Sequence, residues 1–154
     1  MSDPFLSLWA APAALGFALV FNVRRRALAP IAVLAVLAHL LRGWLESVGW
    51  DVVSASFAAA FLTGSAAYLM GPLTGEASPV YAFAPVIPLV PGTLLFDGLE
   101  AIAELTRSQV TGSEEVSRYT MASQKILTAA AVVLALAFGA TAPGLLRPKA
   151  RRSS

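Results

Sequence analysis

Pro85-Val86-Ile87-Pro88-Leu89-Val90-Pro91-Gly92 is the stretch that decides the fold of this 154-residue chain. It lies in a run from Val80 to Phe96 that has no charged residue and is apolar enough to enter a lipid core. Prolines three residues apart remove helical hydrogen-bond donors and clash with preceding carbonyls, so the run cannot be one straight helix. In hydrocarbon the freed carbonyls need partners from protein or water, which predicts an irregular backbone facing a cavity.

The composition indicates an integral membrane protein. Hydrophobic residues make up 57% of the chain and charged residues only 13%, whereas a typical soluble domain carries about 25% charged residues. The chain has no cysteine, which excludes disulfides and thiolate metal sites. Its net charge of +2 comes from arginines and lysines that flank apolar segments, so we expect membrane anchoring and no nucleic-acid binding.

The apolar segments predict an all-α integral membrane protein with about five transmembrane segments, of which the fourth is broken by the prolines. A helical span needs roughly 20 apolar residues. The expected spans cover residues 5–23, 27–45, 52–70, 80–96 and 120–142. They form one membrane domain over residues 1–142, and a basic tail follows over residues 143–154. Pro30 is expected in the first turn of the second span, where proline is tolerated.

The basic residues set the expected orientation. The arginine loop at Arg24–Arg26 and the basic tail are predicted to be cytoplasmic, with the N-terminus outside. The acidic segment 97–118 is then outside, and its helical apolar stripe predicts that part of it lies along the membrane surface. If the proline run only dips into the membrane and returns, four spans result and the tail is outside.

Small residues recur four positions apart in several of the predicted helices. Such spacing lets helix backbones approach closely in lipid, although alanine is also simply common in this chain. The spaced residues are Ala14 and Ala18, Ala60 and Gly64, and Ala131, Ala135 and Gly139.

Two motifs resemble the small-subunit half of the threonine/serine exporter family. The first is Pro88–Gly92 preceded by Ser78–Phe83, and the second is Gly16–Leu28 followed by Ala38–Arg42. They lie in the family's order, with two helices between them. The chain departs from the family pattern before Pro88, where the first proline is shifted by one position and its glycine is missing.

The resemblance implies an exporter of small hydrophilic metabolites, either threonine/serine-like amino acids or small dicarboxylates. It further implies a multi-pass protein of the bacterial inner membrane. The chain looks like the short partner of a split system, so a large polytopic subunit of the same family is expected as its partner. Coupling to the proton gradient is expected as well.

The proline segment supplies the candidate substrate pathway, because broken helices expose carbonyls and helix ends that can bind a solute's ammonium and carboxylate groups. A proline-kinked helix that only packs is the alternative. Asn22 and Thr93 can line the same site, and Asn22 can equally cap its helix. The candidate pathway residues are Pro85, Pro88, Pro91, Gly92, Thr93 and Asn22.

Three ionisable residues, His39, Asp97 and Glu100, complete the candidate set. His39, the single histidine, is a candidate for proton coupling or an ordinary packing residue. Arg42 and Lys125 are expected to snorkel towards the membrane interface, with Glu100 or Glu104 as an alternative partner for Lys125. Asp97 and Glu100 can form an acidic outer vestibule, or belong to a solvated loop.

Catalytic and cofactor motifs are not expected in this sequence. It carries neither a HExxH nor a GxSxG pattern, nor a glycine-rich phosphate loop. We therefore expect no enzyme activity, no cofactor and no metal site. Two further hypotheses stay open: a membrane assembly subunit that does not itself transport, and a homo-oligomeric channel.

Overall fold

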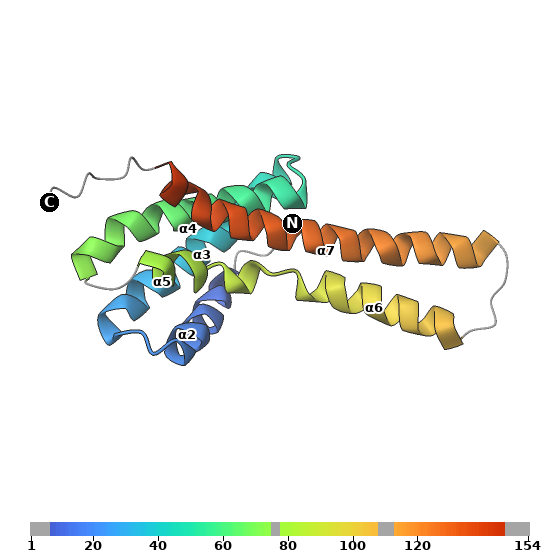
Figure 1. Cartoon of the computed structure of the whole chain (residues 1–154), viewed down its shortest axis with the longest axis horizontal. Helices are drawn as coiled ribbons and strands as arrows, with labels where there is room; N and C mark the ends of the chain where they lie inside the picture. Colours follow the sequence, from blue (N-terminus) through green and yellow to red (C-terminus); the bar gives the residue numbers. More distant parts are fainter. Residues whose placement is uncertain (1–6, 75–77, 108–112, 147–154) are drawn as a thin grey trace, which may run out of the picture. The chain divides into compact units, whose positions relative to one another are not determined.

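The computed structural model describes residues 7–74, 78–107 and 113–146, and within these residues all regular structure is helical (Figure 1). The first six residues and residues 147–154 of the predicted tail lie outside the described residues, as do parts of the predicted loops, whereas residues 143–145 of that tail belong to α7. The elements in chain order are α2 (Ala10–Val20), α3 (Arg25–Ser47), α4 (Val52–Thr74), α5 (Ser78–Phe83), the 3-10 helix η1 (Ile87–Leu89), α6 (Gly92–Arg107) and α7 (Ser113–Leu145).

Three helical stretches of the described chain are long and apolar enough to cross a membrane: Arg25–Ser47, Val52–Gly71 and Val116–Leu145. A fourth span results if the helical pieces on the two sides of the proline break, Pro79–Leu89 and Gly92–Arg107, are counted together. Helix α2 is apolar but shorter, with 11 residues. The predicted all-α membrane fold with a broken fourth segment is therefore confirmed, whereas the count of five spans stays a prediction.

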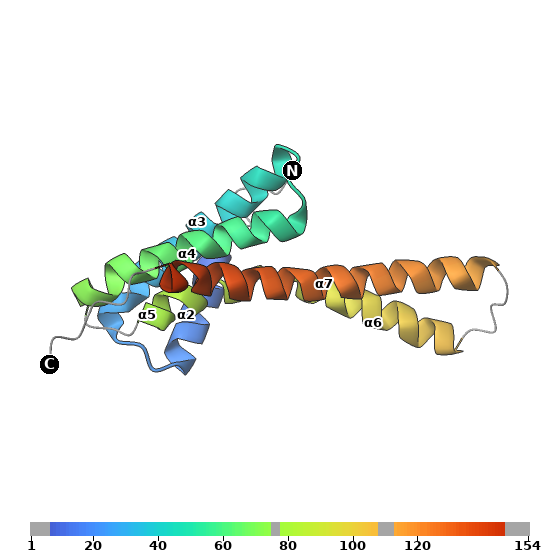
Figure 2. The same ribbon diagram turned by 45° about the horizontal axis from the view of Figure 1, so that its top comes forward.

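The chain divides into two compact units, residues 1–89 with 135–154, and residues 90–134. In the first unit, α4 packs on both α3 and α5, and α3 also packs on α2. In the second unit, α6 and the first part of α7 run side by side in both views (Figures 1 and 2). The predicted surface segment 97–118 thus begins inside a helix, because α6 starts at Gly92 and continues through Asp97.

The second span begins earlier than predicted. Arg24 is the N-cap of α3 and Arg25 and Arg26 form its first turn, so the arginines belong largely to the helix and not to a loop. Pro30 consequently lies inside α3 and not in its first turn. Because proline has no N–H, the carbonyl of Arg26 loses its usual helical donor. Positive charges at a helix N-terminus oppose the helix dipole, so the dipole does not favour these arginines at the start of α3.

The turn between α3 and α4 is closed by backbone and side-chain hydrogen bonds. Gly49, with a φ of 97°, ends α3 in the left-handed conformation that glycine adopts without strain. Asp51 then caps α4, since its Oδ2 accepts hydrogen bonds from the backbone N–H groups of Val53 and Ser54 at 3.0 Å each. These bonds to the carboxylate, above all the one from Ser54, lower the pKa of Asp51.

Small residues let α4 and the end of α7 approach closely within the first unit. A Cβ added to Gly64 would overlap the backbone carbonyl of Ala140. A Cβ on Gly139 would lie 2.6 Å from the carbonyl oxygen of Phe57 and 2.9 Å from Cβ of Ala60. The predicted close approach of small-residue faces is therefore confirmed for this helix pair, and Ala14 and Ala18 are likewise fully buried on α2.

Gly64→Ala is expected to lower the stability of the purified protein by about 1–3 kcal/mol, because the new methyl group meets rigid backbone and not a movable side chain. Gly16→Ala is the matched control, since a Cβ there meets nothing within 4 Å. Thermal unfolding in mild detergent measures both variants. Equal melting temperatures for the two variants would contradict the close helix contact.

Candidate functional site

The broken segment joins α5 to α6 and contains η1. Pro85, Pro88 and Pro91 have no N–H to offer to the carbonyl four residues earlier. Those carbonyls belong to Tyr81, Ala84 and Ile87. The helical ladder ends where this chemistry predicts, because the N–H of Ala84 still reaches Val80 at 3.3 Å and the following bonds tighten to the 3-10 pattern.

The tightened turns also redirect donors that a regular helix would use otherwise. The N–H of Val86 donates to the carbonyl of Phe83 at 2.9 Å, and the N–H of Leu89 donates to that of Val86 at 2.9 Å. In an α-helix, Val86 would serve the carbonyl of Ala82. The carbonyl of Ala82 therefore needs a donor from another part of the molecule.

Thr63 of α4 supplies a donor to this carbonyl. Its hydroxyl is completely buried and lies 3.3 Å from the carbonyl oxygen of Ala82 and 2.8 Å from that of Ala60 in its own helix. A hydroxyl has a single hydrogen, so the two acceptors share it and the shorter bond is the stronger. Thr63 thereby links the end of α5 to α4 by a polar contact inside an otherwise apolar bundle.

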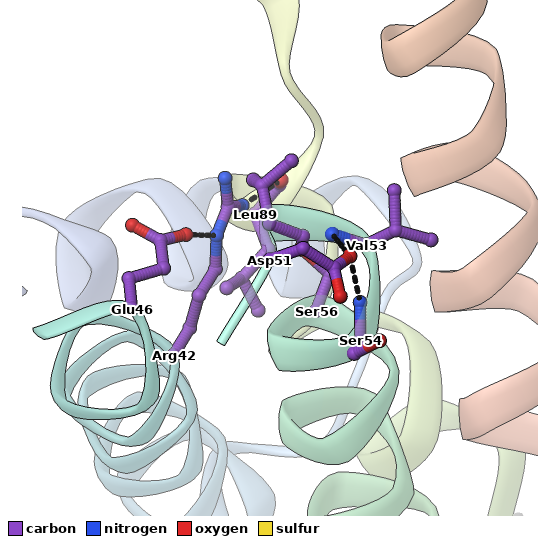
Figure 3. Close-up of polar contacts among 8 residues, drawn as sticks. Arg42, Glu46, Asp51, Val53, Ser54, Ser56 and Leu89 are labelled. Carbon is purple, nitrogen blue, oxygen red and sulfur yellow. Dashed lines mark hydrogen bonds and ion pairs between the residues drawn. The ribbon is translucent and has the colours of Figure 1, made fainter. Parts of the chain in front are cut away.

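Arg42 of α3 supplies the second polar contact to the broken segment (Figure 3). Its Nη1 donates to the carbonyl oxygen of Leu89, the last residue of η1, at 2.7 Å, while its Nε donates to Oε1 of Glu46 at 2.8 Å. The side chain is only 18% exposed. A backbone carbonyl and a carboxylate thus hold the guanidinium against the segment, and the position of Arg42 at the membrane interface stays a prediction.

The candidate pathway prolines fall in both compact units. Pro85 is completely buried and Pro88 is half-buried in the first unit. Pro91 is buried, and Gly92 and Thr93 are exposed, in the second unit. The role of these five residues in a substrate pathway stays a prediction.

Asn22 ends α2 as a helix cap. Its φ of 54° places it in the left-handed region, which asparagine tolerates better than most residues. Its N–H donates to the carbonyl of Leu19 and the N–H of Val23 donates to that of Ala18, which together form a Schellman motif. Its side chain is exposed. The capping interpretation is thus confirmed, and contact with substrate stays a prediction.

His39 lies on α3, three residues before Arg42. Its Nδ1 is buried and has no hydrogen-bond partner among the described residues. Buried polar atoms are nearly always satisfied in native proteins, by protein groups, water or an ion, so this nitrogen is available to a partner outside the described residues. The proton-coupling role of His39 stays a prediction that this unpaired nitrogen supports.

Asp97 and Glu100 are exposed on the first turns of α6. Oδ2 of Asp97 lies 3.3 Å from Nζ of Lys125 on α7, with the two side chains 50% and 44% exposed. The expected partners of Lys125, Glu100 or Glu104, are therefore wrong, and Asp97 takes their place. An exposed ion pair of this kind contributes about 0–1 kcal/mol, so it adds little to the stability of the contact between α6 and α7.

The fold and the broken segment together indicate which class of protein this is. A bundle of apolar helices, with a helix-breaking segment buried inside it and held by side chains of neighbouring helices, is the architecture of a multi-pass membrane transporter. The family model described as threonine/serine exporter, ThrE, matches residues 6–146. The chain belongs to this family. No solved structure matches it.

Sequence reasoning missed two residues of this site, Arg42 as a partner of the broken segment and Thr63. The pair Arg42 and Glu46 was detectable from its spacing, because residues four apart share one helix face. The contact to Leu89 was not detectable, since it joins residues 47 positions apart. Thr63 gave no sequence signal beyond being a polar residue inside an apolar span.

Thr63→Val is expected to destabilise the protein by about 0.5–1.5 kcal/mol, the usual range for an interhelical hydrogen bond in a membrane protein. The change removes the hydroxyl and nearly keeps the shape. Thr141→Val is the matched control, because the exposed hydroxyl of Thr141 bonds only carbonyls of its own helix. Thermal unfolding in detergent measures both variants. A melting temperature lowered as much in Thr141→Val as in Thr63→Val would rule out a stabilising interhelical bond.

Proposed function

We propose that this chain is the small subunit of a two-component exporter that moves small hydrophilic metabolites across the bacterial inner membrane. The substrate class is threonine/serine-like amino acids or small dicarboxylates. Membership of the threonine/serine exporter family supports the direction and class of transport. A large polytopic subunit of the same family is the proposed partner. The proposed orientation has the N-terminus outside and the C-terminus in the cytoplasm.

The buried broken segment carries this proposal. A backbone that leaves the helix at membrane depth is tolerated where protein or a water-filled cavity satisfies its polar groups. In this chain, Thr63 and Arg42 satisfy carbonyls on the two sides of Pro85 and Pro88. Such a segment can offer further carbonyls and helix ends to the ammonium and carboxylate groups of a solute.

Proton coupling forms part of the proposal, with His39 as the titrating group. A histidine changes charge near physiological pH. The buried Nδ1 supports a functional role for His39 because that atom has no hydrogen-bond partner within the described parts of the chain. Asp97 and Glu100, exposed near the start of α6, are the proposed acidic vestibule on the outer side.

An assembly subunit without a pathway of its own is the second candidate. The small-residue spacing of the sequence motivates it, because such faces mediate helix association in membranes. The faces at Gly64 and Gly139 are already used between α4 and α7 of this chain. Under this alternative the prolines shape a binding surface for the large subunit and do not contact solute.

The deciding experiment reconstitutes the chain, with and without the large subunit, into vesicles loaded with labelled threonine, serine or a small dicarboxylate. We expect efflux of at least one solute from the pair, stimulated by a pH gradient, and none from the chain alone. Efflux from the chain alone would favour the homo-oligomeric channel. A pair that moves none of these solutes would refute the proposed function.

Pro88→Ala and Pro91→Ala separate the transporter from the assembly subunit. Each restores a helical donor where the pathway needs a break, so we expect roughly tenfold slower efflux, equivalent to about 1.4 kcal/mol in the barrier. Pro30→Ala is the control, a proline inside α3 and outside the broken segment. Unchanged efflux together with weaker co-purification of the large subunit would favour the assembly role.

A further inference from the structure

We propose that Arg42 is a positioning residue for transport, which latches the end of the broken segment by holding the carbonyl of Leu89, and that Glu46 aims its guanidinium. The inference rests on the proposed function. It assigns control of the segment's position to two residues of α3, which lie outside the proline-containing segment.

The carbonyl of Leu89 is an acceptor that the local backbone leaves without its usual donor. It is the last carbonyl of η1, and the chain then passes through Val90 and Pro91. The N–H of Gly92, which a continued 3-10 turn would direct to Leu89, instead donates to the carbonyl of Val90 at 2.8 Å. The guanidinium of Arg42 fills that vacancy at 2.7 Å.

The guanidinium is held from two sides by different nitrogen atoms. Nε donates to Glu46 one turn further along α3, and Nη1 donates to Leu89, so both bonds form at the same time (Figure 3). Arginine's planar fork has fixed donor directions. Glu46 therefore sets the direction in which Arg42 points, as well as balancing its charge.

The surroundings of this hydrogen bond are mostly shielded from water, which raises the free energy needed to break it. They also make a charged side chain unfavourable at this position unless it has partners. The side chain of Leu89 is 1% exposed and that of Arg42 is 18% exposed, so little water competes for the bond. Arginine is disfavoured within apolar helices and marks functional positions there. A charged donor strengthens a hydrogen bond to a carbonyl in such surroundings.

The latch joins two elements that are far apart in the sequence and differ in rigidity. Helix α3 is 23 residues long and its end is fixed by the Gly49 turn. Element η1 has three residues and short-range backbone bonds. Helix α2 also packs on η1, but Arg42 supplies the polar contact to its last carbonyl, and loss of that contact is expected to free the segment to rearrange.

The absence of cysteine from the whole chain gives a clean test of segment release. Ala84→Cys places a probe on the broken segment at a completely buried position, and Ala55→Cys places a matched buried probe on α4. Labelling by a membrane-permeant maleimide is measured for each probe in the otherwise native chain and with Arg42→Gln.

We expect Arg42→Gln to accelerate labelling at Ala84→Cys by roughly tenfold, as local opening does, and to leave Ala55→Cys unchanged. Acceleration at both probes would show that the whole bundle loosens. Acceleration at neither would show that the bond from Arg42 to Leu89 does not hold the segment in place. Either result would overturn the latch. Glu46→Gln keeps an acceptor for Nε, so a smaller acceleration at Ala84→Cys is expected.

The second readout is efflux from vesicles that contain the chain and its large subunit. Arg42→Gln is expected to lower the maximal rate roughly tenfold while the apparent KM changes less than about threefold, since the residue acts on the segment and not on the solute. Arg107→Gln, which changes an exposed arginine at the end of α6, is the charge control.

The two readouts fail independently of each other. If the native pair moves no solute, the proposed function fails, and the labelling result still decides whether Arg42 latches the segment. If the native pair transports and Arg42→Gln transports equally fast, the positioning role is overturned while the proposed function stands.

Discussion

Backbone polar groups that are removed from water must find partners, and this requirement connects every polar feature of the first unit. Pro85 and Pro88 withdraw donors from the carbonyls of Tyr81 and Ala84, and the tightened turns redirect others. Side chains of neighbouring helices supply donors instead: the hydroxyl of Thr63 on α4 donates to Ala82, and the guanidinium of Arg42 on α3 donates to Leu89. The break is therefore a defined structure with fixed partners and not a flexible interruption.

Close packing of α4 on α7 also helps to satisfy the backbone of the broken segment, because it positions a side-chain donor. The faces of α4 and α7 meet through Gly64, Ala60 and Gly139, where backbone lies against backbone. In lipid, association of helices depends on such van der Waals packing, because burial of apolar surface drives little of it. A tightly packed α4 also holds Thr63 at the depth of Ala82, so the packing fixes the position of the donor that the broken segment requires.

Local chemistry made the helical content and the position of the break accessible from the sequence, and the resemblance of two motifs indicated the family. Apolar run length predicts spans, and proline spacing predicts where a helix ends. Asn22 shows the limit of such inference, since capping and solute contact are both compatible with an asparagine after a helix, and the φ of 54° with the Schellman bonds settled only the capping. Pro30 shows another limit, because helix starts shift by a few residues without a strong local signal.

The sequence by itself determined that this chain is helical, belongs in a membrane and cannot keep a straight helix between Ala84 and Pro91, since those properties follow from side-chain polarity and a missing N–H. It did not determine which groups meet. Lys125 pairs with Asp97 and not with Glu100 or Glu104, and Arg42 bonds the carbonyl of Leu89, 47 positions away in the sequence. Long side chains choose partners by distance and burial, and those exist only once helices far apart in the chain have packed.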